Sequence, residues 1–420
     1  MRKDTCEMLE MPVSRPWTAT EQIGVTRHVI APNLLANRNQ LDVLLLGRDF
    51  GIHKGLGVNG NHTASVLQRA GVRAQDMLVA QDKLPGKLFE TLEKTQPRAA
   101  VLMAFFLDTK TFASVVEAFP DTHFYVKCHS NPQFLAAENS GWQRLLQVAD
   151  VAARLPNVSI GCASEDMLRA LQALGVKSVL LPNVYDFDAS EHVRDIEKFD
   201  DGALHVGLFG ALRPFKNAVG QTCALVMAAR ASRRPLVLHV NGTRVEMSPT
   251  NDLVNMQEIC RRACVRLEVH GWLDYAEFVA LAARMHLALQ VSFTETFNYV
   301  AADCVAAGTP VVGSTAIRFL PTAWKVNPDD SEAIATAILD APTWDVAAGQ
   351  RALADWNRWA AAKLLQELTR PTLRTQAGTK RKRVPTITTT TRRGTQTTST
   401  EGMTRTLSAN LGIGESPYGG

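Results

Sequence analysis

The chain has 420 residues, of which 46% are hydrophobic and 20% charged, a composition typical of globular proteins and long enough for two to three domains at ~150 residues each. Lys and Arg number 45 against 41 Asp and Glu, which gives a net charge of +4. The last fifty residues alone hold eight Lys or Arg and two Glu, so the rest of the chain is slightly acidic, which argues against a basic nucleic-acid-binding domain.

Three other classes of protein are excluded by short-range patterns. The longest apolar run, 99–107, is far shorter than the roughly 20 residues that span a bilayer, and the first fifteen residues have no apolar core typical of a signal peptide. The seven cysteines are scattered without a CxxC pair, which indicates reduced thiols. We therefore expect a cytoplasmic protein rather than a membrane-spanning, collagen-like or disulfide-rich secreted one.

The first half of the chain predicts alternating strands and helices after an arm at 1–38. Short apolar runs bounded by Gly are typical of buried parallel strands, and the segments between them have helical spacing. This alternation predicts a Rossmann-like domain over 39–183. The expected strands are 41–47, 77–80, 99–106, 124–127, 158–161 and 178–181, and the expected helices are 62–70, 85–94, 109–118, 134–149 and 165–174.

An acidic segment, 184–203, interrupts this pattern and is expected to be a linker. A second alternating series follows and predicts another Rossmann-like domain over 204–345. Its expected strands are 204–209, 236–240, 266–269, 287–291 and 310–312, and its expected helices are 217–231, 252–263, 275–283 and 298–307. A last helix, 346–368, is expected to return and complete the first domain.

The tail, 371–420, is expected to be disordered. It contains 14 Thr, a KRKR run at 380–383 and few large apolar side chains, so it cannot bury enough surface to offset the entropy of ordering. The basic run is best interpreted as a solvated stretch, with an import signal or a polyanion tether as alternatives. The fold class expected overall is α/β, with two doubly wound domains facing a central cleft. Ligands of such sheets bind beyond the carboxyl ends of the strands.

The most informative motif is the run from Ser292 to Val312, which has the pattern of a strand, a loop, a helix, a Gly stop and a strand. Glu295 falls in the loop and Asp303 in the helix, so both carboxylates are expected to face one ligand. The amides of Phe297, Asn298 and Tyr299 are expected to begin the helix, a place that suits an anion such as a diphosphate.

A second motif lies between 205 and 217, where a strand ends at Gly210 and two cations, Arg213 and Lys216, precede a helix. Two cations in such a turn suit a pyrophosphate, because they neutralise the charge that builds on a leaving diphosphate.

Together these motifs resemble the signature of retaining nucleotide-sugar glycosyltransferases of the GT-B fold, family 4 type. That signature has Glu, seven residues, Glu, and then Gly, any residue and Pro. Here the second acid is Asp303, one methylene shorter, and the position directly after Gly210, where the family has Arg, is Ala211. Shorter stretches agree: Ser164-Glu165 and Pro182-Asn183 resemble the end of the family's first domain.

The resemblance implies a role for each matched residue. Arg213 and Lys216 hold the diphosphate, Glu295 lies near the donor sugar and Asp303 holds the ribose. The segment containing Gly271 and Trp272 holds the nucleobase, His129 at a strand end lies near the sugar or acceptor, and the glycine stretch around Gly57 approaches the donor or acceptor. It also implies no cofactor and no metal, so the donor is a nucleotide-diphosphate sugar and the acceptor a glycan or another hydroxyl compound. The DxD pattern at Asp186 and Asp188 lies in the expected linker and is discounted as a metal site.

Three alternatives remain open. A weakened relative that binds glycans or acts as a scaffold is permitted by Ala211 and Asp303. An NAD-dependent oxidoreductase is suggested by the GxGxxG at 55–60 with Asp82 downstream, although eight residues separate the glycines from the preceding strand. The same transferase chemistry with a protein or nucleic-acid acceptor is suggested only by the basic tail.

Overall fold

The computed structural model describes residues 40–49, 55–80, 83–137, 140–187, 196–241, 251–271, 273–370, 388–391 and 394–397. The expected arm at 1–38, part of the expected linker and most of the tail lie outside these ranges. Within the tail, the structure describes a short antiparallel pair, β13 (Thr388–Thr391) and β14 (Gly394–Thr397).

The first half forms a six-stranded parallel sheet with the order β2-β1-β3-β4-β5-β6. Its central strands are mostly apolar and buried on both faces, as a parallel sheet covered by helices requires, whereas the edge strands β2 and β6 are partly exposed. The strands are β1 (Val43–Arg48), β2 (Ala74–Val79), β3 (Ala99–Leu102), β4 (His123–Cys128), β5 (Val158–Cys162) and β6 (Ser178–Leu180).

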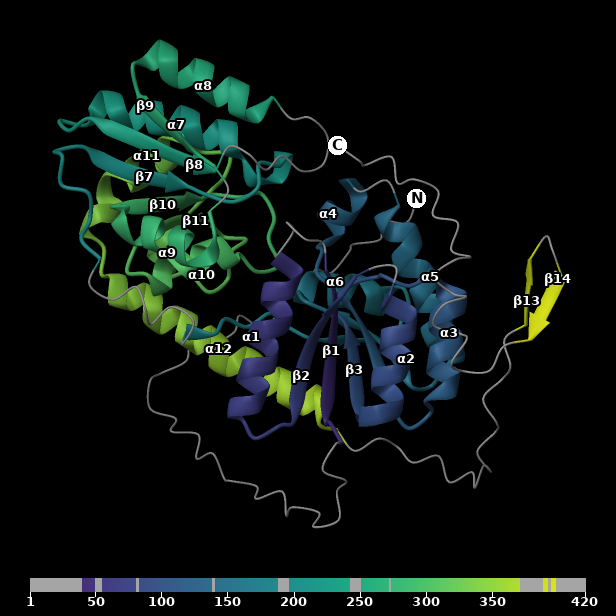
Figure 1. Ribbon diagram of the computed structural model, residues 1–420. Coiled ribbons are helices and arrows are strands. Elements are labelled where there is room, and N and C mark those ends of the chain that lie inside the picture. Colours follow the sequence, from purple (N-terminus) through teal and green to yellow (C-terminus); the bar gives the residue numbers. More distant parts are fainter. Residues whose placement is uncertain are drawn as a thin grey trace, which may run out of the picture. The chain divides into compact units, whose positions relative to one another are not determined.

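Six helices connect these strands: α1 (Gly55–Arg69), α2 (Leu84–Thr95), α3 (Thr109–Ala118), α4 (Pro132–Ala137), α5 (Gly141–Arg154) and α6 (Glu165–Ala173). Side-chain caps fix two of their starts, since Asp108 accepts from the amides of α3 and Ser164 from an amide of α6. In Figure 1, α1 lies on one face of the sheet and α2 and α3 on the other, as right-handed crossovers require.

The second half forms another six-stranded parallel sheet, with the order β12-β11-β10-β7-β8-β9. Its strands are β7 (Leu204–Leu208), β8 (Leu236–Asn241), β9 (Arg266–His270), β10 (Leu287–Gln290), β11 (Val311–Ser314) and β12 (Lys325–Val326). Its helices are α7 (Ala218–Ala231), α8 (Asp252–Ala263), α9 (Tyr275–Arg284), α10 (Tyr299–Ala306) and α11 (Ser331–Asp340), with single 3₁₀ turns at Pro214–Lys216 (η3), Thr322–Trp324 (η4) and Ala341–Thr343 (η5). The α/β fold class with two doubly wound sheets is therefore confirmed.

The last helix, α12 (Val346–Leu368), contributes to both hydrophobic cores. Leu353 packs with residues of α10, whereas Ala360, Leu364 and Leu368 pack in the core of the first sheet. Near its end, the carbonyl of Glu367 accepts a hydrogen bond of 3.0 Å from the Tyr125 hydroxyl on β4.

Three expectations about elements were wrong. Helix α1 begins at Gly55 rather than at 62, because packing of Asn59 and Thr63 on the sheet outweighs the low helix propensity of glycine. The helix expected over 134–149 is two separate helices, α4 and α5. Helix α5 begins at Gly141 after Ser140, and serine and glycine both weaken a continuous helix. Helix α11 and strand β12 were missed.

The strand order places a switch point in each sheet. It is the boundary between two neighbouring strands from which the later strands are added in opposite directions. This point lies between β1 and β3 in the first sheet and between β7 and β10 in the second. Doubly wound sheets bind ligands beyond the carboxyl ends of the strands at such points. The motif that contains Lys216 follows β7, and the motif that contains Glu295 follows β10.

Candidate functional site

The turn after β7 carries Arg213 and Lys216. Gly210 ends the strand with φ +105°, a conformation that favours glycine. The following 3₁₀ turn is closed by a hydrogen bond from the Lys216 amide to the Arg213 carbonyl at 2.9 Å. Asn217 then has left-handed backbone with φ 56°, and its side chain bonds the carbonyls of Val291 and Pro328. The turn is thus fixed against the loop that follows β10.

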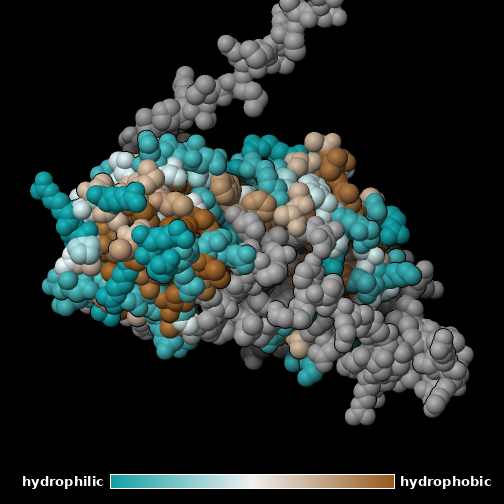
Figure 2. Space-filling model, turned by 90° about the horizontal axis from the view of Figure 1, so that it is seen from above, coloured by the Kyte–Doolittle hydropathy of each residue, from teal (hydrophilic) through white to brown (hydrophobic). Residues whose placement is uncertain are grey.

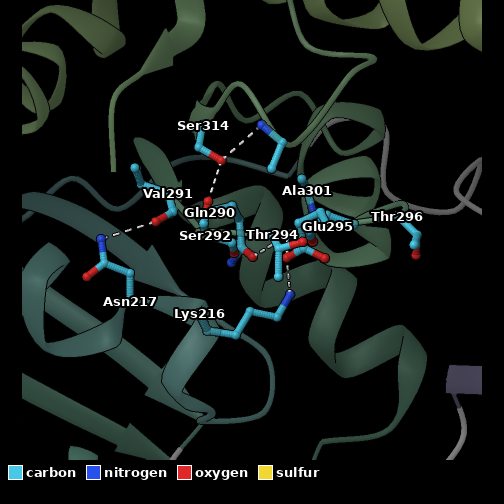
Figure 3. A network of polar contacts seen from close by, with 12 residues as sticks. Lys216, Asn217, Gln290, Val291, Ser292, Thr294, Glu295, Thr296, Ala301 and Ser314 are labelled. Atoms are coloured by element: carbon cyan, nitrogen blue, oxygen red, sulfur yellow. Dashed lines mark hydrogen bonds and ion pairs between the residues drawn. The ribbon is translucent and has the colours of Figure 1, made fainter. Parts of the chain in front are cut away.

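The two motifs meet in an ion pair between Lys216 and Glu295. The Lys216 Nζ lies 2.5 Å from the Glu295 Oε1, and the two side chains are 18% and 10% exposed. Figure 3 shows the lysine reaching from η3 towards the carboxylate. This pair joins residues that are 79 apart in the sequence and brings together the cation and the acid that the motifs single out.

A chain of amide side chains holds Glu295 in place. The Asn298 Nδ2 donates to the Glu295 Oε1 at 3.1 Å and to the Gln290 Oε1 at 2.8 Å. The Gln290 Nε2 in turn donates to the carbonyl of Phe209 at 2.9 Å. Because Gln290 ends β10 and Phe209 follows β7, this bond crosses the switch point of the second sheet.

Arg213 lies beside an aromatic side chain of the first half. Its guanidinium carbon is 5.5 Å from the centre of the Phe134 ring on α4, within cation–π range. The Phe134 ring is also 6.2 Å from that of Phe215, in the same turn as Lys216. Arg213 and Lys216 are therefore on one short turn, with Phe134 beside it.

Asp303 lies in α10 and is almost entirely buried. Its Oδ1 accepts hydrogen bonds from the hydroxyls of Tyr185, at 2.8 Å, and Tyr275, at 3.0 Å. Burial raises the pKa of this carboxyl to about 7, although both tyrosines act in the opposite direction. Tyr275 begins α9, just after the segment that the resemblance assigns to the nucleobase.

The start of α10 is as the sequence predicts. Asn298 is the N-cap, and its Oδ1 accepts from the amide of Ala301 at 3.0 Å. The side chains of the neighbouring residues serve packing: Phe297 lies against Phe319, and the Tyr299 ring stacks on His62 while its hydroxyl donates to the Val184 carbonyl at 3.2 Å.

His129 follows β4, and its loop is bonded to the loop of Glu295. The carbonyl of His129 accepts from the Thr296 hydroxyl at 2.8 Å. Asn131 donates through Nδ2 to the carbonyl of Glu295 at 2.8 Å and to the Thr294 hydroxyl at 3.0 Å. The hydroxyl of Ser164 donates to the Asn131 Oδ1 at 2.5 Å, which fixes the orientation of that amide.

Other predicted residues lie apart from this network. Gly57 lies within α1, and Gly271 follows β9 with open space around its Cα. Trp272, Asp82 and Asp188 lie outside the described residues. Asp186 forms an ion pair of 2.8 Å with Arg69.

The glycines of the GxGxxG pattern lie on α1 itself. The helix begins at Gly55, so Gly57 and Gly60 are inside it rather than in the turn after a strand. A Cβ at Gly60 would lie 2.3 Å from the Asp76 side chain, so this glycine allows the helix to pack closely on β2. The dinucleotide-binding interpretation gains no support from this geometry.

The described part of the chain carries neither a cluster of metal ligands nor a membrane-spanning helix. No three His, Cys, Asp or Glu side chains gather there in a way that would hold a metal ion, and no helix there is long and apolar enough to cross a membrane. A cavity of about 550 Å³ lies between β2 and α2, away from the network, and is lined by Lys83, Lys87 and Lys94 among others. On the face shown in Figure 2, apolar and hydrophilic residues are interspersed.

Sequence reasoning missed the residues that hold this network together. Gln290 is the last residue of β10, and Asn131 and Ser164 lie in the loops after β4 and β5. Tyr185 and Tyr275, which bond Asp303, were not singled out, although Tyr185 follows Pro182-Asn183 in a stretch that resembles the family and Tyr275 begins an expected helix. The polar type of a residue at the end of a buried strand or in the loop after it is the signal that would have found Gln290 and Asn131.

No protein-family model matches the chain, and the curated proteins contain no significant relative. Solved structures are similar over most of its length. Sucrose-phosphate synthase from Thermosynechococcus elongatus has a TM-score of 0.56 at 15% identity, covering 78% of this chain and 98% of its own. A UDP-forming α,α-trehalose-phosphate synthase from Burkholderia xenovorans, in complex with glucose-6-phosphate, has a TM-score of 0.56 at 13% identity. The match covers 78% of this chain and 97% of the synthase. Anabaena HepE, in complex with UDP and glucose, has a TM-score of 0.53 at 13% identity. The match covers 79% of this chain and 97% of HepE. The fold of this chain is thus that of the GT-B glycosyltransferases.

Proposed function

We propose that this chain, which has the GT-B fold, is a retaining glycosyltransferase that moves a sugar from a nucleotide-diphosphate sugar to an acceptor hydroxyl. The observation that carries the proposal is the Lys216–Glu295 ion pair at the switch point of the second sheet. A cation and an acid paired at the carboxyl ends of β7 and β10 suit a ligand with a negative diphosphate next to a sugar.

Each half of the donor has a candidate partner in this arrangement. Lys216 and Arg213, on one turn, neutralise the diphosphate, and the start of α10 adds amide dipoles of the favourable sign. Glu295 lies next to Lys216 and contacts the sugar. Asp303, eight residues further on, accepts from the ribose hydroxyls, and the segment after β9 holds the base.

The chemistry proposed uses these groups for positioning and charge neutralisation. The bond between the anomeric carbon and the diphosphate oxygen breaks as the acceptor oxygen bonds to the same face of that carbon. The proton of the acceptor hydroxyl passes to the departing phosphate oxygen. Because negative charge grows on that phosphate in the transition state, Arg213 and Lys216 stabilise the transition state more than the bound donor.

The test combines ligand binding with turnover. A thermal-shift panel of nucleotides and nucleotide sugars should identify a donor, since a ligand at 100 times its Kd stabilises a fold by about 2.7 kcal/mol. With that donor, Lys216→Met should lower kcat by about 10²–10³, as removal of one oxyanion-stabilising group does. Lys87→Met, on the exposed surface of α2, is the control and should leave the rate unchanged. Equal rates for both variants would contradict the role of Lys216.

A second candidate is a binding protein that has lost the reaction. It is favoured by Ala211, which stands where the family has Arg, and by Asp303, whose Oδ1 is already bonded by two tyrosines. This candidate predicts a thermal shift with a nucleotide sugar but neither transfer to acceptors nor hydrolysis of the donor. Product analysis by chromatography separates the two candidates.

A further inference from the structure

Asn59 connects a buried lysine to His129. Its side chain points from α1 towards the ends of β4 and β6 and is only 1% exposed. The amide oxygen lies 3.3 Å from the Nζ of Lys127, a β4 residue that is 2% exposed. The amide nitrogen lies 2.6 Å from the Asn183 Oδ1 and 3.5 Å from the His129 Nδ1.

The contacts of Asn59 determine which way its amide points. Burial lowers the pKa of Lys127 to about 7, and in its charged form the ammonium has only hydrogen-bond donors, so it faces the amide oxygen. The two hydrogens of the amide nitrogen are then directed at Asn183 and His129. A flipped amide would set donors against Lys127 and an acceptor against the Asn183 Oδ1.

This orientation settles the protonation of His129. A ring nitrogen that faces an amide N–H must accept, so Nδ1 carries no hydrogen and the hydrogen of the neutral ring is on Nε2. Burial and the charge of Lys127 also lower the pKa of His129 well below 6.5, against a smaller opposite effect of the Met103 carbonyl. His129 is therefore a neutral donor at Nε2.

The Nε2 of His129 is buried, and no described residue offers it a partner with hydrogen-bond geometry. A buried donor left unpaired destabilises the folded chain, and a ligand oxygen can pair with it. The Thr296 hydroxyl donates to the His129 carbonyl, so the backbone of His129 lies beside the loop of Glu295.

We propose that Lys127 and Asn59 are positioning residues that hold His129 as a neutral imidazole with its hydrogen on Nε2, directed at an oxygen of the bound sugar or phosphate. The identity of the ligand rests on the proposed function, whereas the state of the ring does not. Lys127 acts only through Asn59, since its own contact is with the amide oxygen.

The test is NMR of the full chain labelled with ¹⁵N-histidine, which reports directly which ring nitrogen carries hydrogen. The chain has ten His, and His129→Gln identifies the signal of His129. At pH 7 the parent should show Nε2 protonated and Nδ1 unprotonated. A signal with Nδ1 protonated would overturn the proposal without any variant.

Asn59→Asp tests the mechanism, because a carboxylate accepts but does not donate. In this variant the hydrogen of His129 should move from Nε2 to Nδ1, or a second hydrogen should bind at Nδ1. The kcat should fall tenfold or more. Asn61→Asp makes the same change on an exposed position of the same helix and should alter neither. Lys127→Met should give a mixture of His129 forms, with exposed Lys110→Met as its control.

The outcomes separate this inference from the proposed function. If His129 keeps its Nε2 hydrogen and its pKa in both Asn59→Asp and Lys127→Met, the positioning role is wrong, whatever the turnover. If the ring changes as expected but no nucleotide sugar shifts the melting temperature of the parent, the proposed function fails and the positioning role stands.

Discussion

Asp303 makes stability depend on pH in a way that one substitution can isolate. Burial raises the pKa of its carboxyl from 3.8 to about 7 in the folded chain. Between these two values the folded state holds a proton that the unfolded state has lost. The free energy of unfolding therefore falls as the pH rises through this window and levels off above it.

The size of the effect follows from the two pKa values. Between pH 5 and pH 8, the ionisation of Asp303 is expected to cost the parent about 2–3 kcal/mol of unfolding free energy. Asp303→Asn does not ionise, and its Oδ1 can still accept from Tyr185 and Tyr275. The free energy of unfolding of the variant, relative to that of the parent, should thus rise by this amount as the pH rises.

The assay is urea-induced unfolding of parent and variant, followed by tryptophan fluorescence at pH 5, 6, 7 and 8. Only the difference between the two proteins is used, because other groups titrate equally in both. Glu258→Gln, at an exposed ion pair on α8, is the control for loss of a carboxylate. A difference between Asp303→Asn and the parent that stays constant from pH 5 to 8 would refute the raised pKa and the burial argument behind it.

Three other outcomes are expected. Burial lowers the pKa of His239 to about 3, so the stability that its neutral form provides is complete above pH 6.5 and is lost as the pH falls towards 3. The parent should lose about 2 kcal/mol through this group between pH 7 and 5, and His239→Gln should reduce that loss in the same urea assay. Asn131→Ala removes the bonds to the loop of Glu295 and should lower kcat about tenfold. The control Asn61→Ala should leave kcat unchanged, and steady-state rates measure both. Since the lysine and arginine are proposed to neutralise the diphosphate, turnover should be unchanged by EDTA, and a loss restored by Mg²⁺ would contradict this.

The alternation of strands and helices was predictable because each element has its own short-range signal. Apolar runs such as Val43–Leu46 are buried whatever their partners, and caps such as Asp108 act within one turn. Elements without such a signal were misplaced: α1 was expected to begin at 62, and tertiary packing extends it to Gly55. Local propensity could not foresee that contact with the sheet.

The sequence predicted that Lys216 and Glu295 would lie beside one ligand, because both residues follow strands whose carboxyl ends meet at one edge of a sheet, but it did not predict their direct ion pair. The partners of Asp303 were not expected. Tyr185 is 118 residues away from it and Tyr275 is 28 away, and the sequence assigned neither of them a role. Such contacts depend on where separate segments come to lie, which spacing along the chain does not encode.

The sequence alone determined the α/β class, the position of most strands, and the cation and acid of the candidate site. Periodicity and turn chemistry act over a few residues, and they suffice for these features. The tertiary structure decided the strand order, the protonation of Asp303 and His129, and the bonds from Asn131 to the loop of Glu295. Those depend on burial and on contacts between distant segments, because a side chain's pKa and hydrogen-bond partners are set by what folding packs around it.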